Sequence, residues 1–232
     1  MRLSTAQMAH FVARGFLSLE AVVPDVVNQK FLGDIGKASP TADSIQAHYG
    51  RIMQASTIPL VTPGTPLREA YEPSSALAQV VNVPEVSGAI ASLVGSTCVV
   101  DHHFLHITFP PEYHPENAPS HAQPTHQDST IDPRLTFDIQ LFYFPHEITP
   151  AMGGTRFIPG THNRVVNEAA IARYQNIVGQ QHAVCPAGTV MIFHKGLWHG
   201  GGHNQSDQLR YMFKVRLAPT QRPHWQGEDY DA

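Results

Sequence analysis

The sequence predicts a mainly β fold with helices at its N-terminal end, closed into a jelly roll or barrel. Up to about residue 95, apolar residues recur mostly at helical spacing. From 96 to about 219, short segments rich in β-branched and aromatic residues follow, each bounded by glycine or proline. One short helical pattern, near 167–175, interrupts these segments. The rest of this half is therefore expected to form paired strands.

The length and composition are typical of one globular domain. With 232 residues we expect a single domain over 1–232, with a helical part at about 1–95 and a jelly-roll core at about 96–219. The net charge of −4, without a basic run, argues against nucleic acid or a membrane as a partner. No apolar run reaches the roughly 20 residues that cross a bilayer, and the first residues do not form a secretory signal. Two cysteines are too few for a disulfide framework, so we expect a cytoplasmic protein.

Three helices are expected in the N-terminal part. The first begins after Ser4, whose hydroxyl can cap it in a capping box with Gln7, and it ends at Gly15. The second helix follows Pro24, and the third spans 84–95. No feature of the sequence predicts an oligomeric state.

The second half should supply the strands. Five segments have strand-forming character: 96–110, 135–145, 154–160, 188–194 and 210–219. Two other segments are rich in proline. The segment 57–75 is expected to be extended and irregular, and 110–125 is interpreted equally well as a lid over a site or as a surface loop.

A pair of metal-binding residue types follows the second of these proline-rich segments. His126 and Asp128 are separated by one residue, so in a strand both side chains leave the same face, roughly 6.6 Å apart. Two histidines and one carboxylate on one face of an octahedron form the site of non-haem Fe(II) oxygenases. The pair therefore predicts such a site if a second histidine approaches from elsewhere in the chain.

The stretch 188–219 offers the missing histidine. His199 is favoured because it lies where a strand gives way to three glycines, a place where the backbone bends tightly. His194 remains the alternative, with a core position expected for it, and His203 is expected to be solvated. His102, His103 and His106, in the strand 96–110, are expected to be packed or exposed, and Cys98 and Cys185 to be small core residues.

An arginine stands eleven residues after His199. Arg210 opens the last strand, and a guanidinium matches the distal carboxylate of 2-oxoglutarate, the electron donor of many such oxygenases. Arg216 lies on the same face of that strand by the period of two and is the second candidate for this role.

Longer motifs resemble one known family. The segments HQD (126–128), GGTRFIPGTHNR (153–164) and WHGGGHNQSDQLR (198–210), with an opening LSTAQMAHFVARGFLSLEAVV, resemble the phytanoyl-CoA dioxygenase family of Fe(II)/2-oxoglutarate oxygenases. The resemblance covers nearly the whole chain and is weakest over 37–95. It implies a double-stranded β-helix, which is a cupin-like jelly roll, wrapped by N-terminal helices.

The resemblance also implies roles for particular residues. It makes His126, Asp128 and His199 the iron ligands and places Arg210 against the 2-oxoglutarate carboxylate. Further positions near the cosubstrate are Thr155, Gln140 and Phe142. One departure is that Gly201 stands where family members often have serine, which removes a possible hydroxyl contact to the cosubstrate.

The function expected on this basis is an Fe(II)/2-oxoglutarate-dependent dioxygenase. It would use O2 to hydroxylate, or otherwise oxidise, a C–H bond of a small or secondary metabolite, with release of succinate and CO2. Asp128 occupies the position that related iron halogenases leave without a carboxylate, which favours hydroxylation. The alternative function is a non-catalytic, metal-containing jelly-roll protein that binds a ligand.

Overall fold

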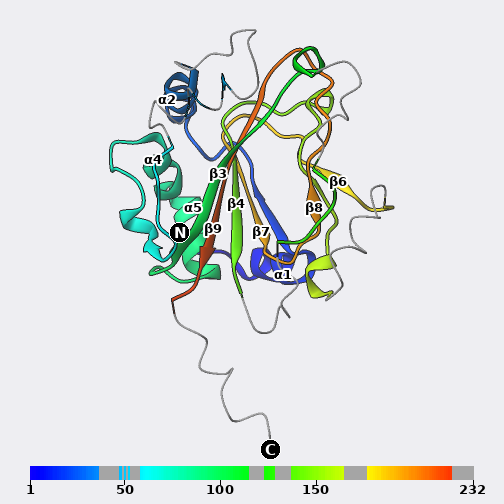
Figure 1. Ribbon diagram of the computed structural model, residues 1–232. Coiled ribbons are helices and arrows are strands. Elements are labelled where there is room, and N and C mark those ends of the chain that lie inside the picture. The colour runs from blue at the N-terminus through cyan, green and yellow to red at the C-terminus, as the bar shows by residue number, and fades with distance from the viewer. Residues whose placement is uncertain are drawn as a thin grey trace, which may run out of the picture.

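The computed structural model describes residues 1–36, 47, 48, 50, 52, 58–114, 123–128, 137–164 and 177–220. Two antiparallel sheets face each other, and helices cover the outer side of the larger sheet (Figure 1). The helical pattern expected near 167–175 and residues 115–122 of the expected lid lie outside the described residues.

The first helix, α1 (Thr5–Arg14), forms as the sequence predicts. The Ser4 hydroxyl accepts a hydrogen bond from the backbone N–H of Gln7, and the Gln7 side chain accepts one from the backbone N–H of Ser4. Gly15 ends the helix at φ 78°, in the left-handed region that favours glycine. This local signal is complete in the sequence, and it reappears unchanged in the structure.

Three further helices lie against the large sheet. They are α2 (Asp25–Gly36), α4 (Ala76–Asn82) and α5 (Pro84–Leu93), and Figure 1 shows them together on one side of it. The sequence predicts α2 and α5 but not α4, whose seven residues are too few for a clear helical period. The segment expected to be irregular contains the short strand β2 (Thr65–Pro66) and a 3-10 turn, Leu67–Glu69.

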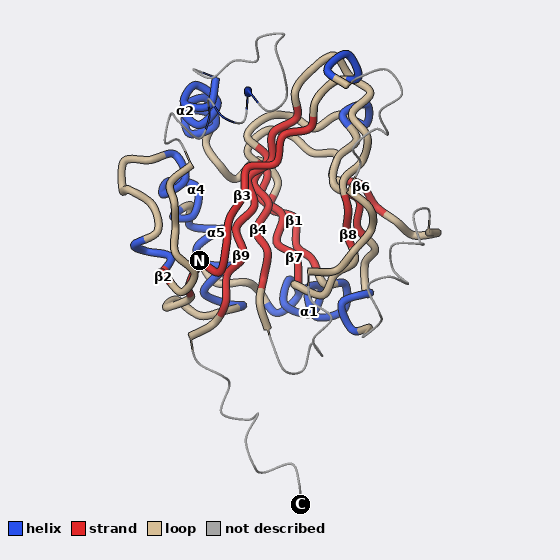
Figure 2. Tube along the Cα trace, in the orientation of Figure 1, coloured by secondary structure: helices blue, strands red, loops and turns tan. Residues whose placement is uncertain are grey.

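The large sheet has six antiparallel strands in the order β1-β7-β4-β9-β3-β2 (Figure 2). Besides β2, these strands are β1 (Phe16–Leu19), β3 (Val99–Thr108), β4 (Ile139–Phe144), β7 (Thr189–His194) and β9 (Arg210–Ala218). The small sheet has the order β6-β5-β8 and consists of β6 (Gln181–His182), β5 (Arg156–Phe157) and β8 (His199–Gly200). Two facing antiparallel sheets form the predicted jelly roll, so the fold class is confirmed.

The two faces of the large sheet have different partners. Side chains such as Leu141, Tyr143 and Val215 point to the helices and share their apolar core. On the other face, Phe142 and Phe193 belong to a second apolar cluster, which lies between the sheets. Because alternate residues of a strand face opposite sides, each buried strand supplies both cores.

In the described ranges, no single helix is long and apolar enough to cross a membrane. Taken together, α4 and α5, which are bent by 65° at their junction, have the length and composition of a membrane span, and nothing else in the described part of the chain indicates one. Both helices bury most of their apolar residues against the sheet. Cys98 and Cys185 are buried and free, as expected of core residues.

One buried hydrogen bond joins the helical layer to the sheet. The Tyr143 hydroxyl, on β4, donates to Asn28 Oδ1, on α2, at 2.7 Å, and both residues are almost fully buried. Asn28 in turn donates to the carbonyl of Val23 at 3.4 Å.

Removing that hydroxyl should destabilise the fold. Tyr143→Phe leaves the Asn28 oxygen buried without a donor, so we expect the free energy of unfolding to fall by about 1–3 kcal/mol in urea denaturation. Tyr113→Phe, at a half-buried position, is the matched control and should change it by less than about 0.5 kcal/mol. Equal effects in the two variants would contradict the importance of the Asn28 contact.

Candidate active site

Backbone pairing brings the first candidate ligand to the third. His126 and His199 form an isolated antiparallel bridge, in which each backbone N–H donates to the other residue's carbonyl at 2.8 Å. His199 opens β8, so the bridge adds His126 to the edge of the small sheet. The two imidazole rings lie side by side, with centroids 4.4 Å apart.

Asp128 completes a cluster of three donor atoms. Its Oδ1 lies 3.3 Å from His126 Nε2 and 3.7 Å from His199 Nε2, and the three donor atoms lie within 4.8 Å of one another. Nitrogen and oxygen ligands lie about 2.0–2.2 Å from a divalent transition metal, so one ion can contact all three. Two imidazoles and a carboxylate are the donor set of non-haem iron sites.

Both histidines have the tautomer that a metal ligand needs. The Nδ1–H of His126 donates to the Pro124 carbonyl at 2.9 Å, and that of His199 donates to the Leu197 carbonyl at 2.8 Å. The Nε2 lone pair of each ring is therefore directed at the cluster. Burial lowers the pKa of His199 to about 3, which keeps its ring neutral and available for a metal.

Asp128 is held in the charged form. Burial alone would raise its pKa, but the neighbouring His126, His199 and Lys214 side chains outweigh burial and hold this pKa well below its usual range. Asp128 therefore offers an anionic oxygen to the cluster at neutral pH.

A cavity of about 160 Å³ opens beside His199. It contains three of the four residues predicted to lie near a cosubstrate, namely Arg210, Thr155 and Phe142. The ring of Phe142 lies 5.8 Å from that of His199, centroid to centroid. Gln140 is not among the lining residues. It lies on the same face of β4, and its side-chain amide donates to the Lys195 carbonyl at 3.5 Å.

Arg210 is fixed by neutral partners. It is 6% exposed, and it donates to the carbonyls of Met152 and Gly153 and, at 2.6 Å, to the Thr108 hydroxyl. Burial lowers the pKa of Arg210 to about 10, so the group is still a cation at neutral pH. Among the residues that the structure describes, none of its recorded partners is a carboxylate.

Glycine allows the loops around Arg210 to come together. A Cβ on Gly153, which has φ 62°, would lie 1.9 Å from the His203 carbonyl oxygen. A Cβ on Gly202 would lie 2.4 Å from the Gly153 carbonyl oxygen, so the backbones touch. Gly153 and Gly202 are therefore required for the packing that places the Gly153 carbonyl at Arg210.

The structure separates the alternatives from the cluster. His194 belongs to the helix-facing side, where its Nδ1 accepts from the Gly196 N–H at 3.0 Å and its ring lies near Phe11 and His162. Arg216 does share the inner face of β9, but it pairs with Asp101. His203 is exposed, as expected.

The sequence does not predict several residues that line the cavity, among them Thr108, His106 and Lys214. The first two lie opposite β9, in the pairs Thr108–Arg210 and His106–Met212. That register is set by tertiary pairing and cannot be read from β3 alone. The alternation of side chains along a strand does predict the orientation of Lys214, because it lies on the face shared by Arg210 and Arg216.

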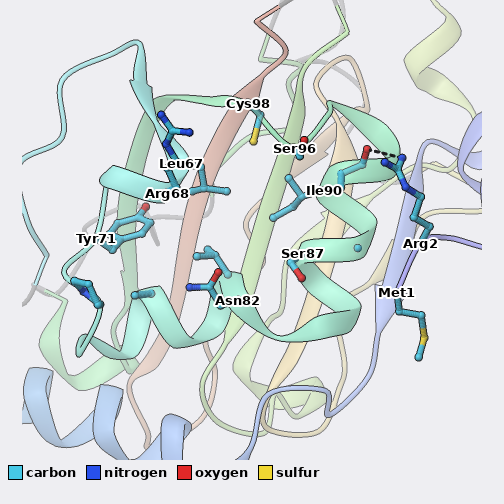
Figure 3. A pocket seen from close by; sticks show the side chains of 15 residues that line it. Met1, Arg2, Leu67, Arg68, Tyr71, Asn82, Ser87, Ile90, Ser96 and Cys98 are labelled. Atoms are coloured by element: carbon cyan, nitrogen blue, oxygen red, sulfur yellow. Dashed lines mark hydrogen bonds between the residues drawn. The ribbon is translucent and has the colours of Figure 1, made fainter.

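A larger cavity, of about 490 Å³, lies on the helical side of the sheet. Figure 3 shows Tyr71, Ile90 and Cys98 around it, with Arg2 and Arg68 also on its wall. None of the predicted site residues lines it. The size of a cavity alone therefore does not locate the three candidate metal ligands, which adjoin the smaller cavity.

Comparison with protein families agrees with the geometry. Residues 13–212 match the family model described as phytanoyl-CoA dioxygenase. The chain belongs to the phytanoyl-CoA dioxygenase family. The sequence-based assignment is thus confirmed, and with it the family's iron, 2-oxoglutarate and O2 chemistry and its action on small molecules.

Solved structures show the same fold at low sequence identity. HygX from Streptomyces hygroscopicus, solved with nickel and 2-oxoglutarate bound, is 12% identical at a TM-score of 0.62, over 95% of this chain and 88% of that one. SnoK, described as a non-heme alpha ketoglutarate dependent carbocyclase from nogalamycin biosynthesis, is 16% identical at a TM-score of 0.62, covering 94% and 84%. AviO1 from Streptomyces viridochromogenes is 17% identical at 0.63, covering 96% and 98%. No curated protein matches the chain.

The cluster should bind one divalent metal ion. We expect His126→Ala, Asp128→Ala and His199→Ala each to weaken Mn(II) binding at least about 100-fold, since each removes one of three ligands. His203→Ala, at an exposed position between β8 and β9, should bind Mn(II) like the parent. Isothermal titration under argon measures the difference. Parent-like binding by any of the three ligand variants would exclude that residue from the site.

The buried His194 should make stability depend on pH. Burial lowers its pKa from 6.5 to about 4, so the unfolded state takes up its proton first. Neutral His194 therefore contributes to the free energy of unfolding fully above pH 6.5. This contribution, on the order of 3 kcal/mol at most, is lost as the pH falls towards 4. His194→Asn, which retains an acceptor for Gly196, should flatten the dependence of unfolding free energy on pH in this window. An unchanged slope would show that His194 does not cause it.

Proposed function

We propose that this protein is an Fe(II)/2-oxoglutarate-dependent oxygenase that hydroxylates, or otherwise oxidises, a C–H bond of a small metabolite, releasing succinate and CO2. The observation that carries the proposal is the convergence of His126 Nε2, His199 Nε2 and Asp128 Oδ1 within 4.8 Å, beside a cavity that contains Arg210. His126, Asp128 and His199 would hold the iron. When bound, iron and 2-oxoglutarate supply the oxidising chemistry, and the chain positions and shields the reactants.

The state of Arg210 supports its role as the carboxylate-binding residue. A buried guanidinium is costly unless an anion accompanies it, and its partners in the described structure are two carbonyls and the Thr108 hydroxyl. Those contacts orient the fork without neutralising its charge. The distal carboxylate of 2-oxoglutarate would supply the missing charge in a bidentate pair.

Thr155 and Phe142 would complete the cosubstrate site. Thr155 is buried and lines the cavity, where its hydroxyl would be within reach of a bound carboxylate. The ring of Phe142 forms an apolar wall beside His199. Gln140, expected in the same role, would act at most through its neighbours, because it lies outside the lining.

The cavity indicates small reactants. Its volume of about 160 Å³ is below the roughly 300–1,000 Å³ of sites for drug-sized ligands, and it suits a five-carbon dicarboxylate. The whole chain contains four lysines, and no cluster of basic residues marks a site for the phosphates of coenzyme A. A small or secondary metabolite therefore fits better than an acyl-CoA. SnoK, which has a similar fold, is described as a carbocyclase from nogalamycin biosynthesis.

Anaerobic addition of Fe(II) and 2-oxoglutarate to the metal-free protein tests the proposal. Chelation of iron by the keto acid gives a weak visible charge-transfer band. We expect the band in the parent, and an at least 30-fold weaker 2-oxoglutarate affinity in Arg210→Met, about 2 kcal/mol for a lost bidentate ion pair. The affinity follows from the band's dependence on 2-oxoglutarate concentration.

Arg216→Met is the matched control, because Arg216 lies on the same face of β9 but pairs with Asp101. Its 2-oxoglutarate affinity should stay within about three-fold of the parent. A larger loss in Arg216→Met than in Arg210→Met would assign the carboxylate to Arg216. Iron binding without the band in the parent would contradict the oxygenase proposal and favour a non-catalytic binding protein.

A further inference from the structure

A buried lysine lies beside the three proposed metal ligands. Lys214, on the inner face of β9, is 7% exposed and lines the same cavity as Arg210 and His199. Its Nζ is 2.6 Å from Asp128 Oδ2 and 5.9 Å from the centroid of the Phe142 ring. The lysine thus contacts one of the three proposed metal ligands directly.

The two oxygens of Asp128 face different partners. Oδ1 is turned to the histidines, 3.3 Å from His126 Nε2 and 3.7 Å from His199 Nε2. Oδ2 is turned to Lys214 at 2.6 Å, and the next cation, Arg216, is farther away at 3.9 Å. The lysine therefore holds the oxygen that does not face the metal position.

We propose that Lys214 is a positioning residue that restricts Asp128 to a single bond to the metal, through Oδ1. This inference rests on the proposed function, since it assumes that His126, Asp128 and His199 hold the ion. An ammonium bound to Oδ2 prevents the carboxylate from turning both oxygens to one cation.

The number of open metal positions gives the lysine its importance. Three protein ligands leave three positions of an octahedron free. A keto acid that chelates through two oxygens would take two of them, which would leave the third for O2. Carboxylates bind metals through one oxygen or through two, and a second bond from Asp128 would occupy a position that the reaction requires.

The residue type agrees with this role. Burying an ammonium costs several kcal/mol unless an anion accompanies it, whereas a methionine fills a similar volume without that cost. Met212 does so two residues earlier on the same face of β9. Of the other charged groups near this face, Arg216 is paired with Asp101, which leaves the carboxylate of Asp128 as the partner of Lys214.

The test counts the waters on a bound metal. In the Mn(II) protein, water enriched in oxygen-17 broadens the electron paramagnetic resonance lines according to the number of bound waters. We expect three waters in the parent and two in Lys214→Met, because Asp128 then gains a second bond. Affinity for 2-oxoglutarate, measured by competition with these waters, should fall at least ten-fold in Lys214→Met.

Two further variants exclude a general packing effect. Lys195→Met breaks a comparable pair, Lys195 Nζ to Asp138 Oδ2 at 2.7 Å, in which neither residue belongs to the cluster, and it should keep three waters. Lys214→Arg retains a charged donor and should keep three waters as well. Two waters in Lys214→Arg or in Lys195→Met would mean that packing determines the count, and this would overturn the proposal.

The remaining outcomes separate the inference from the function on which it rests. Three waters in Lys214→Met overturn the positioning role, and if 2-oxoglutarate affinity also falls, the lysine contacts the cosubstrate itself. Failure of the parent to bind Mn(II) would instead refute the metal site. A parent with three waters and normal 2-oxoglutarate binding upholds the proposed function whatever Lys214→Met shows.

Discussion

The site depends on the backbone bridge between His126 and His199. Two residues that are 73 positions apart in the chain exchange backbone hydrogen bonds of 2.8 Å, which hold the segments that carry both rings side by side. The offset of two residues from His126 then places Asp128. The cations Arg210 and Lys214, on the inner face of β9, line the cavity beside His199. Backbone pairing therefore brings the ligand-bearing segments together, and side-chain hydrogen bonds orient the ligands within the cluster.

Much of this arrangement follows from local signals. The capping box of Ser4 and Gln7, the His-x-Asp pair and the spacing from His199 to Arg210 are each readable within about a dozen residues. The contribution of Lys214 depends on which oxygen of Asp128 reaches it, and that of Thr108 depends on the β3–β9 register. Both are products of long-range pairing, for which a single sequence contains no direct signal. Helix α4 was missed for a different reason, because seven residues give too short a period.

Charge is distributed unevenly across the cavity. Arg210, Lys214 and Arg216 lie on one face of β9, and Asp101 and Asp128 lie opposite the last two. Arg210 is left with neutral partners in the described part of the chain. The inner surface is therefore electropositive at the end remote from Asp101, which is where the proposed function places one carboxylate of the dianion 2-oxoglutarate.

The two strands from the N-terminal part have a protective position in the large sheet. β1 and β2 are its edge strands, so the division near residue 95 does not separate a helical unit from a β unit. β1 covers β7, all six residues of which are buried, over four paired positions. A strand of such apolar and β-branched character is a template for pairing with other chains when its edge is open. By pairing with β7, the short N-terminal strand leaves its own four residues, and not the six buried residues of β7, at the edge of the sheet.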